Sequence, residues 1–177
     1  MRKKNRQSRL SHYQRTVSGE FVYTGDYMAY VDGGKSRKRL LMELWTLGAA
    51  AMICLLAGGF LPVESFRGCG YVLFPYIAAL LAVVAVLWYL GELTGGGEPL
   101  KTYVYASTVL RIPRLAVLSA IGAVLCVLGQ VIRCAKNGSC AQAEFLFMML
   151  EAVGAVLMVL LRQSLNRTQW RKQDKIQ

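Results

Sequence analysis

Long uninterrupted apolar runs dominate the pattern of hydrophobic and polar positions along the chain. Each run approaches the roughly 20 apolar residues that a helix needs to cross the hydrocarbon core of a bilayer. None of the runs shows the polar stripe of a soluble amphipathic helix or the alternation of a barrel strand. The pattern therefore predicts four transmembrane helices, with three spans as the main alternative because the fourth run contains Glu151. The predicted spans are residues 40–61, 71–91, 112–133 and 143–162.

The composition agrees with a membrane protein. Of the 177 residues, 55% are hydrophobic and 18% are charged, whereas soluble domains carry roughly a quarter charged residues. This balance excludes a disordered chain and argues against a soluble globular domain. The predicted fold class is an all-α integral membrane protein, a four-helix bundle whose membrane domain is residues 40–162. Residues 1–39 form a basic N-terminal extension, and residues 163–177 form a basic tail.

Basic residues are distributed unevenly among the segments that the spans separate. The chain has 21 Lys and Arg residues and a formal net charge of +11. Only Arg67, Arg133 and Lys136 fall in the two loops that join the first span to the second and the third span to the fourth. Because basic segments stay on the cytoplasmic side during insertion, both termini and the middle loop are predicted to be cytoplasmic. The predicted location is the cell membrane, with multiple passes.

Two short segments rich in tyrosine favour β-structure on that predicted cytoplasmic side. Residues 20–31 contain two strand-like pieces that flank Thr24-Gly25-Asp26, a pattern typical of a hairpin turn. Residues 102–110 offer a third strand-like piece with alternating tyrosines. Because an isolated hairpin is marginal in water, one interpretation is a small three-stranded cap beneath the bundle. The alternative is an interfacial segment whose aromatic rings rest on lipid headgroups.

Polar side chains inside the predicted spans are the main candidates for chemistry. Glu151 lies within the fourth span, where an ionised carboxylate is costly and is expected to face the bundle interior or a cavity. It would suit proton-coupled transport; alternatively, it is a protonated residue that forms a hydrogen bond to Gln130 or Ser119. Glu144 is expected near the outer boundary, paired with Arg133. Glu151, Glu144 and Gln130 are the intramembrane candidates.

The five cysteines fall into two groups. Cys54 and Cys126 lie within predicted spans, where we expect small core side chains. Cys69, Cys134 and Cys140 fall in the predicted outer loops, where disulfides persist. Cys134 and Cys140 flank an Asn-Gly turn and could pair with each other, or either could pair with Cys69. With one His and no CxxC spacing, the chain has no zinc motif, and we expect neither a metal nor a cofactor.

Basic residues just before the first span predict contact with anionic lipid headgroups. Each such residue contributes on the order of 1 kcal/mol near an anionic leaflet. The residues concerned are Lys35, Arg37, Lys38 and Arg39. No basic reader domain or stacking platform for nucleic acid is evident, so we expect no nucleic-acid partner. An acidic protein partner on the same side is the alternative.

Motifs for catalysis are absent, so we assign no catalytic residue. The chain contains neither GxSxG nor HExxH. Small residues in the spans, such as Gly48, Gly122 and Gly154, allow helices to approach closely, either within the bundle or in a complex with another subunit or copy. The first hypothesis is therefore a non-catalytic accessory or scaffold subunit of a membrane complex. The second is a small oligomeric transporter or channel that uses an intramembrane carboxylate. A membrane enzyme acting on lipids or thiols has the weakest support.

Overall fold

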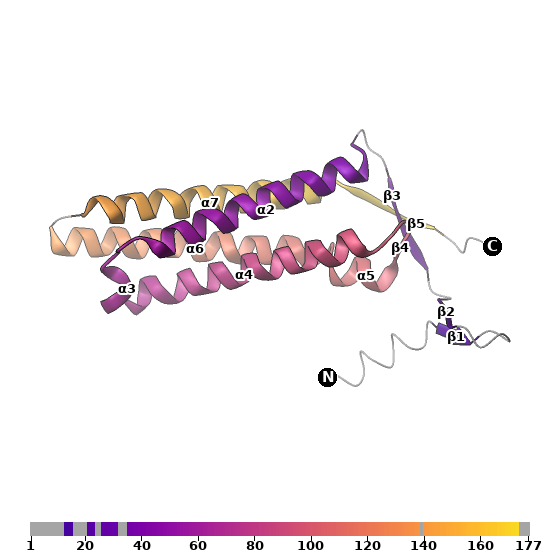
Figure 1. Ribbon diagram of the computed structural model, residues 1–177, viewed down its shortest axis with the longest axis horizontal. Helices are drawn as coiled ribbons and strands as arrows, with labels where there is room; N and C mark the ends of the chain where they lie inside the picture. Colours follow the sequence, from indigo (N-terminus) through magenta and orange to yellow (C-terminus); the bar gives the residue numbers. More distant parts are fainter. Residues whose placement is uncertain (1–12, 16–20, 24–25, 32–34, 139, 174–177) are drawn as a thin grey trace.

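A bundle of long helices forms the body of the protein (Figure 1). Around the bundle, α2 contacts α4 and α7, and α6 contacts the same two helices. The helices of this bundle are α2 (Arg37–Phe60), α4 (Gly70–Gly95), α6 (Ile112–Asn137) and α7 (Gln142–Asn166). The computed structural model describes residues 13–15, 21–23, 26–31, 35–138 and 140–173.

The helices confirm the four predicted spans. Within the described residues, four helices are long and apolar enough to cross a membrane, which supports a multi-pass membrane protein. Each helix extends beyond its predicted span at one end or both. The side chain of Ser36 accepts a hydrogen bond from the backbone N–H of Arg39 at 3.4 Å and so caps an early first turn of α2. At its other end α6 continues to Asn137 and stops at Gly138, whose φ of 67° suits glycine.

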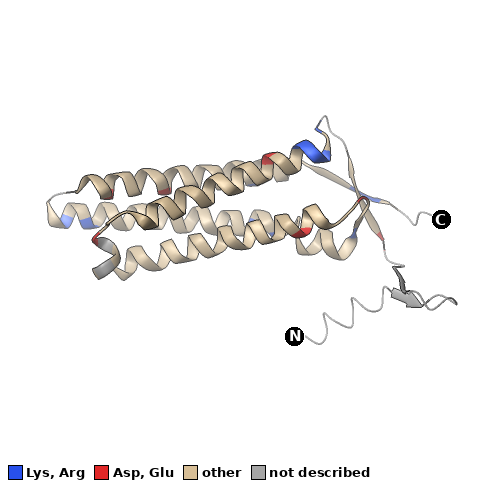
Figure 2. Ribbon diagram, viewed as in Figure 1, with Lys and Arg blue, Asp and Glu red and all other residues tan. Residues whose placement is uncertain are grey.

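The two ends of the bundle differ, and we name them by what they contain. At the sheet end, a small β-sheet lies beside the first turn of α2 and the last turn of α7 (Figure 1). At the loop end, residues 61–69 connect α2 to α4 and include the short helix α3 (Ser65–Gly68). Residues 138–141 connect α6 to α7 at the same end. Charged residues gather toward these two ends of the molecule (Figure 2).

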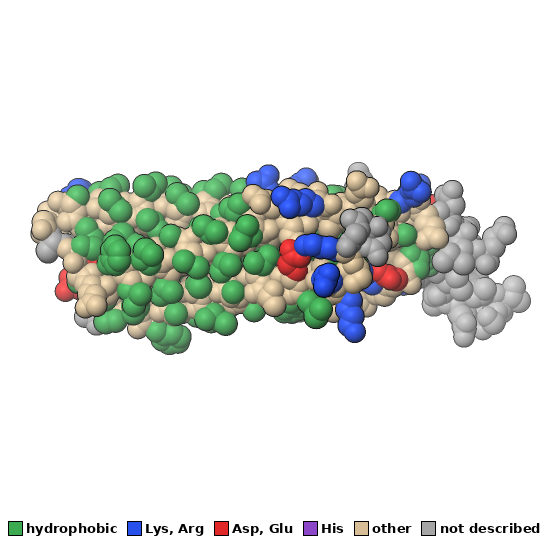
Figure 3. All heavy atoms as spheres, turned by 90° about the horizontal axis from the view of Figure 1, so that it is seen from above, with side chains coloured by type: hydrophobic (Ala, Val, Ile, Leu, Met, Phe, Trp, Pro, Cys, Tyr) green, Lys and Arg blue, Asp and Glu red, His purple; other side chains and the backbone are tan. Residues whose placement is uncertain are grey.

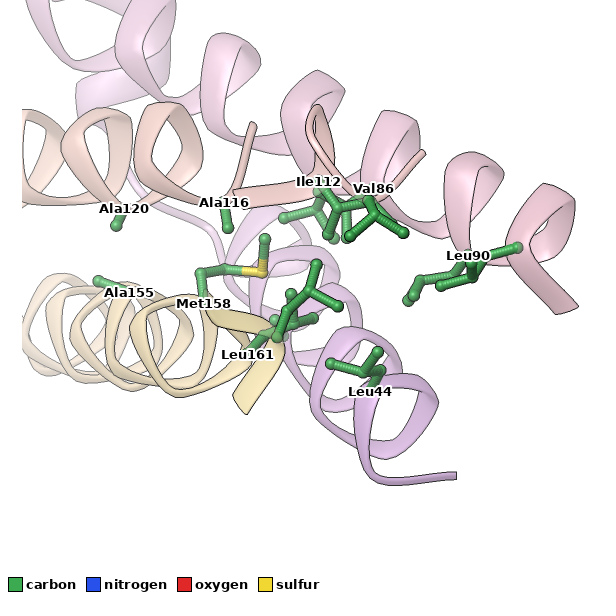
Figure 4. Packing of buried hydrophobic residues seen from close by; sticks show 14 of the residues in the cluster. Leu44, Val86, Leu90, Ile112, Ala116, Ala120, Ala155, Met158 and Leu161 are labelled. Atoms are coloured by element: carbon green, nitrogen blue, oxygen red, sulfur yellow. The ribbon is translucent and has the colours of Figure 1, made fainter. Parts of the chain in front are cut away.

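Apolar side chains fill the bundle and also cover its outside. Leu44, Met158 and Leu161 are fully buried where the helices meet (Figure 4). On the outer surface, Phe60 is 87% exposed and Phe74 is 73% exposed, and hydrophobic side chains extend along the visible face (Figure 3). Soluble monomers rarely expose apolar surface on this scale. The outer surface is therefore suited to lipid.

Glycines bring α6 into backbone contact with α4. A Cβ atom at Gly122 would lie 3.0 Å from the carbonyl oxygen of Pro75, and one at Gly129 would lie 3.2 Å from the carbonyl oxygen of Tyr71. Any side chain at either position would push the helices apart. The predicted role of small residues in helix packing is confirmed at these two positions.

A three-stranded antiparallel sheet closes the sheet end, with strands from three distant parts of the chain. The register pairs Tyr27 with Lys101 on one side of the central strand and Tyr30 with Trp170 on the other. In spatial order, its strands are β4 (Leu100–Lys101), β3 (Tyr27–Val31) and β5 (Gln169–Gln173). A small three-stranded sheet is present, as one of the two interpretations predicted, but only β3 among its strands was predicted to belong to it.

The partners of the N-terminal strands differ from the prediction. The expected hairpin over residues 20–31 would have paired β3 with the strand before it. Instead, β2 (Phe21–Tyr23) pairs with β1 (Tyr13–Arg15), and β3 pairs with β4 and β5. The physical reason is pairing length, because β5 matches β3 over all five of its residues, whereas β2 has three. Residues 24 and 25 of the expected turn lie outside the described residues.

Two other segments also differ from expectation. The prediction of a strand over residues 102–110 is wrong, because Thr102–Ser107 form the short helix α5. Alternating tyrosines over so short a stretch do not distinguish a strand from a turn or two of helix. The C-terminal residues are also more than a tail, since α7 continues to Asn166 and β5 follows it. The β5 sequence QWRKQ has no apolar alternation, so its pairing depends on the neighbouring strand.

Candidate functional site

A pair of buried polar side chains lies inside the bundle, on α6 and α7. Gln130 and Glu151 are both 0% exposed. Neither the two side-chain polar atoms of Gln130 nor the two carboxyl oxygens of Glu151 has a hydrogen-bond partner among the described residues. Buried polar atoms are rarely left in this condition. The two predicted intramembrane candidates are therefore both buried inside the bundle and both unsatisfied.

The expected hydrogen bond from Glu151 to Gln130 or Ser119 is wrong, and the register of α6 against α7 explains why. Glu144 pairs with Arg133, and because the helices are antiparallel this places Glu151 near Cys126, with which it interacts electrostatically. Gln130 is four residues from that level, or roughly 6 Å along the helix. Ser119 is farther still, on the opposite side of Cys126, at roughly 10 Å.

The surroundings of Glu151 offer it little polar compensation. Two nearby donors are occupied by backbone carbonyls, since the Tyr76 hydroxyl donates to Leu55 at 3.0 Å and the Cys126 thiol donates to Val72 at 3.5 Å. A Cβ atom at Gly58 would lie 3.6 Å from a Glu151 carboxyl oxygen, so the α2 backbone borders the site directly. An ionised carboxylate in such surroundings is costly without a bound cation or water, and the neutral acid is cheaper.

An aromatic cluster separates Glu151 from the loop end. The ring of Phe66 on α3 lies 5.1 Å from that of Tyr76 and 5.3 Å from that of Phe147, measured between centroids. Phe147 is fully buried and lies one helical turn from Glu151 on α7. These rings shield the carboxyl group from that end of the bundle.

A charged cluster at the loop end holds the two connections together. The Glu144 carboxylate accepts hydrogen bonds from the Arg133 guanidinium and, at 3.2 Å, from the backbone N–H of Ala141. Arg133 also donates to Glu64 at 3.1 Å. The predicted pair of Arg133 and Glu144 is confirmed, and both side chains are buried, with exposures of 9% and 6%. Its arrangement is that of a structural clamp on residues 61–69 and the α6–α7 turn.

All five cysteines are free thiols. Cys126 is buried, as expected for a core side chain, whereas Cys54 is half-buried and Cys134 lies in the last turn of α6 and not in a loop. Cys134 and Cys140 lie near each other: their sulfur atoms and a carboxyl oxygen of Glu144 lie within 4.8 Å of one another. Among the described residues these three side chains are the group that could hold a metal ion. Glu144 is already engaged by Arg133 and by a backbone N–H, however, which weakens it as a ligand. The predicted disulfide stays a prediction, and this proximity suits a bond between Cys134 and Cys140.

Of the four predicted lipid-contacting residues, Lys35 precedes α2 and the other three lie in its first turn, and two of the four form ion pairs. Lys35 forms an ion pair with Glu43 at 2.6 Å, and Glu43 also accepts a hydrogen bond from Ser164 on α7 at 2.9 Å. Arg37 donates to the carbonyl of Leu93 at 3.1 Å and lies 3.5 Å from a Glu98 carboxyl oxygen. These two basic residues therefore help to join the helices at the sheet end. Lys38 and Arg39 are exposed.

Arg114 and Arg162 line a shared groove at the sheet end, a placement that sequence reasoning missed because it treated both only as topology signals. Arg114 lies in the first turn of α6 and Arg162 near the end of α7. The available signal was the antiparallel order of the last two spans, which places the start of one level with the end of the other.

Comparison of the chain with protein-family models, curated proteins and solved structures gives no match.

Proposed function

We propose that this protein is a multi-pass protein of the cell membrane that acts as a non-catalytic accessory or scaffold subunit. The observation that carries this proposal is the β-sheet at the sheet end. It joins the N-terminal segment, the connection between α4 and α6, and the C-terminal segment into one unit. Such a sheet offers a fixed surface outside the bundle, while the bundle anchors it in the membrane.

Aromatic contacts support the view that this surface is firmly attached. The ring centroid of Trp170 on β5 lies 5.4 Å from that of Tyr30 on β3 and 5.5 Å from that of Tyr105 on α5. All three residues also pack against the main core cluster. Aromatic pairs of this kind add about 0.5–1.5 kcal/mol beyond the area they bury.

The outer edge of β5 is the part of the sheet that suits a partner. No described strand pairs with β5 on the side away from β3, and an open edge is a template for an added strand. Arg171 on this strand is exposed, and Lys172 pairs with Asp26 at 2.8 Å. A partner segment with acidic side chains fits this edge best.

We also propose that the sheet end is cytoplasmic. All but three of the 21 basic residues belong to the termini or to the connection between α4 and α6, and such segments remain on the cytoplasmic side. A membrane-impermeant thiol reagent tests this in intact cells. It should label the exposed Cys140 and leave an introduced Gln173→Cys unlabelled until the membrane is opened. The reverse pattern would overturn the orientation.

Purification from the native membrane in mild detergent tests the accessory role. We expect a second protein to co-purify at a defined ratio, measured by the mass of the intact complex. Arg171→Gln with Lys172→Gln should release it, because the charge at the β5 edge is lost. Arg111→Gln is the matched control, since Arg111 is an exposed basic residue at the same end that donates instead to the Tyr89 hydroxyl. A homogeneous assembly without any other protein would contradict the proposal.

The second candidate is a small oligomeric transporter or channel that uses the Glu151 carboxyl group. It is favoured by the four unsatisfied polar atoms of Gln130 and Glu151 inside the bundle, because intramembrane carboxyl groups of this kind serve proton and ion pathways. Proteoliposomes with a pH-sensitive dye inside measure it. Wild-type protein should dissipate a pH gradient, Glu151→Gln should not, and the exposed Glu92→Gln should behave as wild type. Equal leak from all three variants and from empty vesicles would exclude this function.

A further inference from the structure

A groove on the outside of the bundle follows α6 and α7 from the sheet end toward the middle. Its upper part, nearer the sheet end, has a volume of about 560 Å³ and is lined by Arg114, Arg162 and Trp170 among others. Its lower part, of about 310 Å³, is lined by apolar side chains such as Val124, with Arg162 at its upper limit. Val117 and Arg162 line both parts, so the two form one continuous groove.

The polar part of the groove carries two positively charged side chains, Arg114 and Arg162. Arg114 and Arg162 come from antiparallel helices and lie at the same level, and both are exposed. No described residue forms an ion pair with either of them, whereas Lys35 and Arg37 at the same end are both paired. Two guanidinium groups at the rim of a pocket between helices are complementary in charge and hydrogen-bond donors to the phosphate of a lipid headgroup.

The apolar part of the groove has the shape of a site for an acyl chain. Ala116 and Ala120 on α6 and Met158 on α7 contribute to its walls, and the two alanines turn toward α7 (Figure 4). Ala116 and Met158 are fully buried at the base of the groove, and its accessible surface is formed by the exposed side chains of Ile121, Val124, Leu125 and Val159. From Arg114 to the last lining residue, Leu125, α6 rises roughly 16 Å. This length matches half of the roughly 30 Å hydrocarbon core, which is the depth of one leaflet.

We propose that this groove binds one phospholipid with an anionic headgroup. The headgroup phosphate lies against Arg114 and Arg162, and one acyl chain lies along Val124 of α6 and Val159 of α7. A soluble anion would use only the upper part, so the apolar extension assigns the site to a lipid. The bound lipid bridges α6 and α7 from outside, at the level of the sheet. This inference is independent of the partner and transport proposals, since it needs neither an added strand nor Glu151.

The test measures lipid binding to the purified, delipidated full-length protein by native mass spectrometry. The probes are phosphatidylglycerol and phosphatidylcholine with the same acyl chains. We expect one phosphatidylglycerol per chain, bound more tightly than phosphatidylcholine. Arg114→Gln with Arg162→Gln should weaken phosphatidylglycerol about tenfold to thirtyfold, as expected for two lost contacts to an anionic headgroup, and should remove the preference.

A matched control separates this site from general attraction to a basic surface. Lys38→Gln with Arg39→Gln removes the same charge from exposed positions on α2, away from the groove, and should leave phosphatidylglycerol binding unchanged. An equal loss in this control, or no loss in the Arg114 and Arg162 variant, overturns the proposal.

Filling the groove tests the acyl-chain part. Val124→Trp should weaken both lipids, while Val84→Trp on α4 should weaken neither. Val124 and Val84 are 51% and 47% exposed, so neither change disturbs the core. Two other occupants would give distinct results. If glycerol 3-phosphate competes for the site as well as the lipid does, the occupant is a soluble anion. If Val124→Trp dissociates a dimer and leaves lipid binding unchanged, the occupant is a second copy of the chain. Either result overturns the proposal.

Discussion

The two halves of the bundle are built differently. Toward the sheet end, the core consists mainly of apolar side chains, such as Leu44, Leu90 and Leu161. Toward the loop end, the interior includes Gln130, Glu151 and the pair of Arg133 and Glu144, all of them buried. Charged side chains at the sheet end lie mainly on the outside (Figure 3). Charged side chains therefore lie inside the bundle in one half and mainly outside it in the other.

This contrast distinguishes polar side chains that stabilise the fold from polar side chains that are candidates for binding or transport. The Arg133 and Glu144 pair is fully engaged and joins two connections, which explains its burial without any activity. The side-chain polar atoms of Glu151 and Gln130 form no hydrogen bond with a described residue, so they do not help to hold the helices together. At the sheet end, Arg114 and Arg162 likewise form no ion pair with a described residue. Polar groups that the fold does not use are the better candidates for binding.

The largest effect is expected where the inward pair is broken. Glu144→Ala should destabilise the protein by about 3–5 kcal/mol, because it leaves the buried Arg133 guanidinium without its main partner. Thermal unfolding in detergent measures the loss. Glu64→Gln is the control, because the Glu64 side chain is 86% exposed and its contact with Arg133 is worth about 1 kcal/mol or less. Similar losses in both variants would contradict a buried clamp.

A cavity in the apolar half should have the next largest effect. Leu161→Ala removes a fully buried side chain from the main core cluster and should cost about 2–4 kcal/mol through lost packing and a residual cavity. The exposed Leu160→Ala on the same helix should change the unfolding temperature little. The same measurement in detergent compares the two, and equal shifts would mean that this half is not packed as described.

Removing the unsatisfied carboxyl group should act in the opposite direction. Glu151→Leu exchanges a buried polar group without a described partner for an apolar one of similar size and should stabilise the protein by about 1–2 kcal/mol. A rise in stability together with a loss of transport would indicate that the carboxyl group is kept for function. If Glu151→Leu destabilises as strongly as Glu144→Ala, then Glu151 has a structural partner and the contrast within the interior is wrong.

The smallest effect is expected at the sheet. Trp170→Ala removes the ring that contacts Tyr30 and Tyr105 and should cost about 1 kcal/mol. The loss should be local, so backbone amides of residues 27–31 should exchange faster with solvent while those of α4 and α6 stay protected. Trp88→Ala, at a position that is 71% exposed on α4, should leave the sheet amides unchanged. Uniform loss of protection would mean that the sheet and the bundle unfold as one unit.

Much of the candidate site could be predicted from residue type and depth. Glu151, Gln130 and the pair of Arg133 and Glu144 were identifiable because polar side chains are rare within an apolar run. The absence of a hydrogen bond between Glu151 and Gln130 could not be predicted. It depends on the register of α6 against α7, which places the two residues about one helical turn apart. The groove with Arg114 and Arg162 was missed for the same reason, because it requires knowing which helices are neighbours.

The amino-acid sequence alone determined the four helices, the apolar outer surface and the gathering of basic residues at the termini and the middle connection. These features follow from hydrophobicity and charge, which act on each segment separately. Only the tertiary structure decided which segments form the sheet. The polar C-terminal residues pair with β3, whereas residues 102–107 form a helix outside the sheet. Short strands gain their stability from pairing and not from their own sequence, so their partners emerge only when the helices bring distant segments together.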